Sequence, residues 1–141
     1  MFLLMRHENT IVYQRCLALM ETAREVIEQL PRGFSLLADQ LRRNTSSPAH
    51  NFAEGYYQDS VKQQRRFFGY AMQSAREASA SFDTAHAFRA ANPDIVARGK
   101  REALEIVKML SKFKAPREQA SEPGVSPQGG GTQDGRFQVI R

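Results

Sequence analysis

The sequence predicts an all-α fold, an up-down-up-down four-helix bundle, and three observations lead to this prediction. Apolar residues recur at steps of three and four in four segments of the chain. Short connections containing proline, glycine, asparagine or serine separate these segments, as is typical of antiparallel neighbours. The chain has 141 residues, 41% of them hydrophobic, which is enough for one domain with a buried core.

The first helix is predicted over residues 10–30, after an N-terminal arm of residues 1–9. Asn9 or Thr10 can cap its start, and Pro31 ends it. Its apolar face is formed by Val12, Cys16, Leu19, Met20, Ala23, Ile27 and Leu30. At ~1.5 Å per residue, this helix is roughly 30 Å long.

The second helix is predicted over residues 35–57, although residues 41–57 are rich in loop-forming types. The apolar period continues on both sides of Pro48, so we predict one helix kinked there. Proline cannot donate to the carbonyl one turn back, which costs about 3 kcal/mol unless the surroundings compensate. The hydroxyls of residues 45–47 can bond freed carbonyls. Gly55 stands where the helix is expected to end.

A structural polar motif is predicted at the corner between the second and third helices. It consists of Pro48, Asn51, Glu54 and Gly55. Asn51 and Glu54 are three residues apart, so they share one side of the helix, near its apolar stripe. We expect a semi-buried network that includes Arg43 and Arg76, because partly buried polar groups need partners.

The third helix is predicted over residues 60–91, with Asp59 and Ser60 capping its start. The fourth is predicted to begin at Pro93 with Asn92 as its cap and to end near residue 113. The third helix buries small residues between phenylalanines, which allows a neighbouring helix to approach closely. Its expected core residues are Phe67, Ala71, Ala75, Ala78, Phe82 and Ala85. Those of the fourth are Val96, Ala103, Val107 and Leu110.

The two ends of the chain differ from the predicted bundle of residues 10–113. Residues 114–141 are rich in proline, glycine, serine and glutamine, which predicts a flexible, disordered tail. The closing RFQVIR alternates apolar and polar residues, as a docking peptide does. The alternative is that this segment is a frayed terminus. The opening MFLLMR is too short for a signal peptide; packing is favoured over an upstream start codon.

The composition and motifs argue against an enzyme and favour a cytoplasmic protein without a cofactor or metal. The sequence has one cysteine, Cys16, which suits a reducing compartment, and its apolar runs are too short to span a membrane. Glu-x-x-His pairs for a di-iron bundle and a phosphate-binding loop are absent from it. His50 with Glu54 is at most half of a metal site, and Cys16 falls on a core face.

One stretch resembles a known family signature. Residues 40–43 read Gln-Leu-Arg-Arg, small residues and Pro48 follow, and residues 51–55 read Asn-Phe-Ala-Glu-Gly. This pattern resembles that of the small bacterial four-helix-bundle family first described from reading frames in rRNA intervening sequences. FFGYAMQSAREAS at residues 67–79 also looks like the third-helix block of that family. Phe52 replaces the usual isoleucine, and the long tail is a departure from the pattern.

The resemblance implies a homopentamer with a basic surface and a central channel. The family includes the accessory variability determinant of diversity-generating retroelements, which binds nucleic acid and a reverse transcriptase. We therefore expect a non-enzymatic accessory protein that binds RNA or DNA together with a reverse transcriptase, without a small-molecule substrate. The alternative is an oligomeric scaffold that docks a partner protein and uses its tail as a tether.

Charge is consistent with nucleic-acid binding. The net charge is +5, of which residues 1–113 carry +4, and an assembly multiplies this excess. The candidate phosphate-binding residues are Arg42, Arg43, Lys62, Arg65, Arg66, Arg98, Lys100 and Arg101. The alternative is that these cations solvate outer faces and pair with neighbouring acids.

The apolar stripes are wider than a lone bundle needs, which predicts a subunit interface or, alternatively, a wider core. The flanking residues are Tyr13, Leu17, Phe68, Met72, Ile95, Ile106, Met109 and Phe113.

Overall fold

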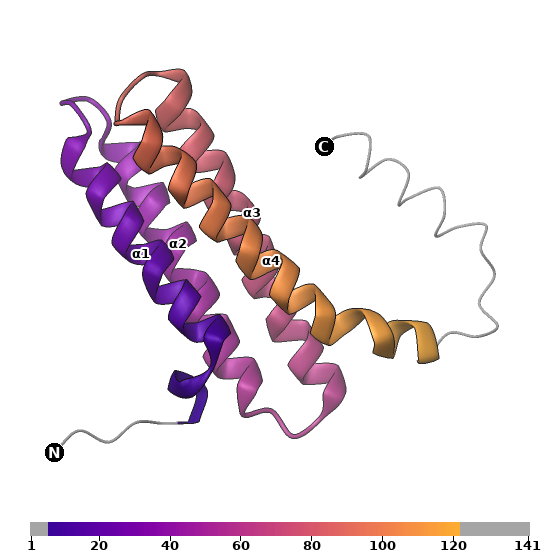
Figure 1. Ribbon diagram of the computed structural model, residues 1–141. Coiled ribbons are helices and arrows are strands. Elements are labelled where there is room, and N and C mark those ends of the chain that lie inside the picture. The colour runs from indigo at the N-terminus through magenta and orange to yellow at the C-terminus, as the bar shows by residue number, and fades with distance from the viewer. Residues whose placement is uncertain (1–5, 122–141) are drawn as a thin grey trace, which may run out of the picture.

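The computed structural model is an antiparallel bundle of four helices, as predicted (Figure 1). The structure describes residues 6–121, and side chains only up to residue 113. Its elements are a 3-10 turn η1 (Arg6–Asn9), α1 (Ile11–Gln29), α2 (Ser35–Tyr56), α3 (Val61–Ala87) and α4 (Pro93–Ser121). Each helix packs against the two that neighbour it around the bundle, and α4 closes the ring by packing against α1.

The predicted N-caps of α1, α3 and α4 are confirmed. The Thr10 hydroxyl accepts a hydrogen bond from the backbone N–H of Tyr13 at 3.2 Å. Ser60 receives the N–H of Gln63 in the same way at 3.0 Å. The Asn92 side chain accepts two backbone N–H groups of the first turn of α4, at 2.7 and 3.3 Å. These bonds satisfy helix-terminal donors, so the polar connections define where each helix begins.

Helix α2 continues through Pro48, which confirms one helix across the loop-like stretch. Thr45 donates to the Leu41 carbonyl at 2.6 Å, and Ser46 donates to the Arg42 carbonyl at 2.8 Å. Pro48 and Thr45 are both buried, so the apolar ring of the proline contributes to the core. An interior proline and back-bonded hydroxyls both bend helices.

The prediction for the end of the third helix was wrong. Helix α3 ends at Ala87, because Arg89 adopts a left-handed φ of 52°. The N–H of Ala90 then reaches the Ala85 carbonyl at 2.9 Å, and that of Arg89 reaches the His86 carbonyl at 2.9 Å. This pair of bonds is a Schellman motif in which arginine occupies the position usually taken by glycine.

The predictions for the two ends of the bundle also differ from the structure. Helix α4 runs to Ser121, eight residues beyond the predicted end, because Pro116 does not stop it and strong helix formers follow. Within the predicted N-terminal arm, residues 6–9 form η1, with His7 buried. The MFLLM segment and the RFQVIR terminus lie outside the described residues.

The core confirms most of the predicted apolar faces, with two kinds of difference. Met20 and Leu30 of the predicted first helix are only partly buried, and on three helices the buried residue is the neighbour of a predicted one. Val26 is buried instead of Ile27, Phe68 instead of Phe67, and Ile106 instead of Val107. Adjacent positions are only 100° apart on a helix, so spacing alone does not choose between them. Three residues assigned to the flanks of wide stripes therefore belong to the core of the bundle. They are Phe68, Met72 and Ile106.

Close packing in the bundle depends on two glycines. A Cβ added to Gly55 would lie 2.9 Å from Phe68, and one added to Gly99 would lie 2.5 Å from Phe82. Gly55 is buried in the last turn of α2, one residue before the helix ends at Tyr56 and close to the predicted end, and its φ is not left-handed, so its role there is close approach. Both glycines admit a phenylalanine ring of α3, which fixes the register of α3 against its neighbours.

Candidate nucleic-acid interface

The eight cations predicted to bind phosphate lie in two groups along the bundle. A hydrogen bond between Asn44 and Ser81 (3.3 Å) places the middle of α2 beside the last turns of α3. Ser81 is 16 residues from Arg65, or about 24 Å along the helix. Lys100 pairs with Asp83, two residues from Ser81, so Arg42 and Arg43 lie at about the same level along the bundle as the α4 group, Arg98, Lys100 and Arg101, but on the diagonally opposite helix. Lys62, Arg65 and Arg66 lie at the opposite end.

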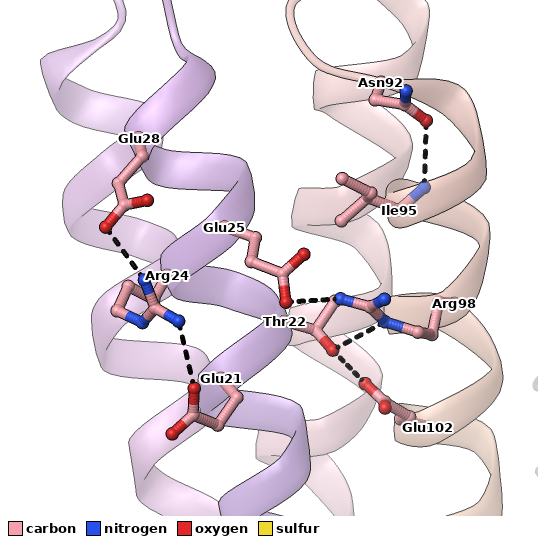
Figure 2. A network of polar contacts seen from close by, with 9 residues as sticks. All are labelled: Glu21, Thr22, Arg24, Glu25, Glu28, Asn92, Ile95, Arg98 and Glu102. Atoms are coloured by element: carbon pink, nitrogen blue, oxygen red, sulfur yellow. Dashed lines mark hydrogen bonds and ion pairs between the residues drawn. The ribbon is translucent and has the colours of Figure 1, made fainter.

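Arg98 belongs to a polar network that joins α1 to α4 (Figure 2). Its guanidinium lies 2.7 Å from the Glu25 carboxylate, and its Nε donates to the Thr22 hydroxyl at 3.2 Å. Thr22, which is buried, donates in turn to Glu102 at 2.6 Å. The hydrogen bond to Glu25 raises the pKa of Arg98. Arg98 thus stabilises the α1–α4 contact, and its charge is compensated within the subunit.

Two more predicted cations have acidic partners. Lys100 pairs with Asp83 of α3 at 2.6 Å, and Arg42 pairs with Asp39 one turn back at 3.2 Å. Arg43 and Arg101 are exposed, and neither has an ion-pair partner among the residues with described side chains. The end of the bundle with five predicted cations therefore presents two uncompensated ones.

The first half of α3 is the most uniformly basic surface of the described chain. Residues 61–76 contain four cations and no acid. Residues of this segment spaced by three and four form one outward face, which we call the α3 stripe. The α3 stripe consists of Lys62, Arg65, Arg66, Gly69, Gln73 and Arg76. No ion pair to its four cations is found among residues 6–113, and the Nε of Arg65 is buried without a hydrogen-bond partner.

Arg76, Gly69 and the adjacent Tyr70 were not among the predicted binding residues. Arg76 falls on the α3 stripe because it is ten residues, close to three turns, from Arg66. The absence of acids from residues 61–76 was a visible signal that could have identified it.

The predicted polar motif takes a different form in the structure. Asn51 donates to the Ser47 carbonyl at 3.1 Å and to its hydroxyl at 2.9 Å, and Ser47 bonds Ser74 of α3 at 2.7 Å. Glu54 is exposed and meets Gln58 at 3.5 Å. The hydrogen bond between Ser47 and Ser74 thus joins α2 to α3, and Asn51 supports it from the α2 side. Glu54 is exposed and takes no part in this network.

The described residues assemble no metal or nucleophile site. No group of three or more histidine, cysteine, aspartate or glutamate residues is placed to hold a metal ion in that part of the chain. Cys16 is buried, and burial raises the pKa of its thiol to about 12, so the thiol is protonated at neutral pH. Across residues 6–121, no helix has the length and apolar content needed to cross a bilayer.

Apolar surface remains outside the core. A groove of about 540 Å³ between α3 and α4 is lined mainly by small and apolar side chains, including Ala80, Leu104 and Val107. Leu104, in this groove, is 53% exposed; Phe113, which lines a separate pocket with Phe68 and Tyr56, is 52% exposed. Large exposed side chains in and near a groove are typical of contact surfaces.

The fold and these surfaces define a small four-helix bundle with one basic helix face and exposed apolar residues. Residues 8–112 match the model of the 23S rRNA-intervening sequence protein family, and the chain belongs to this family. A solved structure with a similar fold is a protein of unknown function from the S23 ribosomal protein family of Bacteroides thetaiotaomicron VPI-5482. The two are 17% identical, with a TM-score of 0.67, over 74% of this chain and 100% of the other. No curated protein matches the chain.

Proposed function

We propose that this protein is a non-enzymatic, basic, homo-oligomeric accessory protein of the cytoplasm that binds the phosphate backbone of RNA or DNA. The observation that carries the proposal is the α3 stripe, whose four cations have no acidic partner among the residues with described side chains. Unpaired lysine and arginine side chains release counterions from nucleic acid on contact, and this term is independent of sequence. The family description, which refers to 23S rRNA, is consistent with an RNA-linked role.

Assembly into a homopentamer, which the family resemblance implies, is part of the proposal. Several copies would place several α3 stripes on one particle and multiply the net charge. The exposed Leu104 and the α3–α4 groove supply apolar surface for subunit contact. Association with a reverse transcriptase, which the resemblance also implies, is proposed as the setting in which the nucleic acid is bound. The mass of the purified protein in solution tests the first point, and co-purification with the enzyme tests the second.

Charge reversal tests the nucleic-acid proposal. In the test variant, Lys62, Arg65 and Arg66 are all replaced by glutamate. Fluorescence anisotropy with a labelled 20-nucleotide RNA is measured between 50 and 200 mM salt. We expect the reversed protein to lose binding, and the salt slope of the unmodified protein to be about −0.7 to −0.9 per phosphate contacted.

A matched control carries the same change in net charge at other exposed positions. It replaces Arg32, Lys108 and Lys112 by glutamate, and these side chains have no ion-pair partner among residues 6–113. The control should keep most of the affinity. Equal loss in both variants would mean that overall charge, and not the α3 stripe, determines binding. If the unmodified protein shows no salt-dependent binding, the proposed function is wrong.

A further inference from the structure

An aromatic side chain next to the α3 stripe is contacted by two neighbours on its own helix and is partly exposed to solvent. Tyr70 is 40% exposed and lies four residues after Arg66 on α3. The Nε of Arg66 donates to the Tyr70 hydroxyl at 2.8 Å, and the guanidinium lies 5.7 Å from the centre of the ring. Phe67 packs edge-on against the same ring, with centroids 5.8 Å apart. Two neighbours on the same helix therefore restrict the ring before any ligand arrives.

Gly69, the residue before Tyr70, borders open space. A Cβ added there would meet nothing within 4 Å, so packing inside the subunit does not require a glycine. Its φ is not in the left-handed region, so the helix does not require a glycine either. A glycine in a helix interior costs about 1 kcal/mol relative to alanine. Glycine at such a position allows a ligand to approach the backbone closely.

The charge and the ring together match one class of partner. Cations alone bind duplex and single strands alike through phosphate. An exposed, pre-positioned aromatic ring adds a surface on which an unpaired base stacks, and bases in a duplex are not free to do so. The α3 stripe and the adjacent Tyr70 together supply both, because Lys62 and Arg66 lie one turn apart on the side of the stripe nearest Tyr70.

We propose that the α3 stripe binds single-stranded nucleic acid, with a base stacked on Tyr70 beside Gly69 and phosphates bound by Lys62 and Arg66. This inference rests on the proposed function and deepens it by selecting single strands over duplexes. Arg66 both orients the ring and offers its remaining N–H groups to phosphate. Readout of base edges is not required, so the preference is for strand form and not for sequence.

The test compares a 20-nucleotide RNA, the matching DNA strand and the RNA duplex, all at one salt concentration. We expect the unmodified protein to bind both single strands more tightly than the duplex. Tyr70→Leu should weaken single-strand binding by about 5- to 150-fold, the range of one base stack, and leave duplex binding nearly unchanged. Tyr70→Phe keeps the ring and should retain most of the affinity.

Two further variants separate stacking from other effects. Phe88→Leu removes an aromatic side chain that is 66% exposed on the same chain, about 27 Å along α3 from Tyr70, and should not change binding. Gly69→Ala should fold at least as stably as the unmodified protein, because the added methyl group meets nothing outside its chain neighbours, and should weaken single-strand binding, because the methyl group occupies space that a strand bound along the α3 stripe would use.

The outcomes distinguish this inference from the proposed function. Equal affinity for duplex and single strand, with no effect of Tyr70→Leu, would refute the stacking inference and leave backbone binding in place. If the unmodified protein binds none of the three probes, the proposed function fails as well. If Gly69→Ala or Tyr70→Leu changes the mass of the assembly instead, the face is a subunit contact and the inference is wrong.

Discussion

Gly99→Ala is expected to destabilise the protein although alanine is the better helix former. The new Cβ would lie 2.5, 2.6 and 2.8 Å from three atoms of the Phe82 ring, which is fully buried. Overpacking of a core typically costs about 1–3 kcal/mol, and contacts this short correspond to the upper end. The gain in helix propensity returns about 1 kcal/mol. The net loss in the free energy of unfolding is therefore about 2 kcal/mol.

Gly69→Ala serves as the matched control for this prediction. It makes the same chemical change in a helix interior, but at a position where the methyl group meets nothing within 4 Å. The free energy of unfolding should rise by about 0.5–1 kcal/mol. Urea denaturation followed by circular dichroism at 222 nm measures both values. The two substitutions should thus change the free energy of unfolding in opposite directions, which helix propensity alone does not predict.

A double variant tests the proposed cause directly. Phe82→Leu creates room beside Gly99, so adding Gly99→Ala to Phe82→Leu should cost less than adding it to the unmodified protein. Additive effects, or a stabilising Gly99→Ala, would show that the ring moves aside without cost and would refute the reasoning from close packing.

Two other predictions concern Cys16 and Arg89. Burial raises the pKa of the Cys16 thiol from its ordinary value of about 9 to about 12, so the fold keeps a proton that the unfolded chain releases. The full stability is present below pH 9 and declines above it, by about 1.4 kcal/mol per pH unit until pH 12. Urea titrations from pH 8 to 10.5 should show this fall in the free energy of unfolding above pH 9, and Cys16→Ala should not show it. If Cys16→Ala shows the same pH dependence as the unmodified protein, other groups cause it. Arg89→Gly should raise the free energy of unfolding by about 0.5 kcal/mol, because glycine adopts the φ of 52° without steric cost; a lower melting temperature would contradict this.

The amino-acid sequence alone determined the architecture and most helix starts. Thr10, Ser60 and Asn92 cap their helices as predicted, because an N-cap is a local interaction between a side chain and the next few N–H groups. The apolar period also correctly predicted that α2 continues through Pro48. Periodicity reports which face is buried, and that information is present at each position of the helix.

Only the tertiary structure decided what the candidate residues do. Arg98 and Lys100 were equivalent to Arg66 in the sequence, but contacts with α1 and α3 compensate their charges. Gly55 and Gly69 are both glycines inside helices, yet one admits a ring of α3 and the other leaves open surface. Charge compensation and free space depend on which side chains a neighbouring helix brings into contact, and helix spacing contains no information about those neighbours.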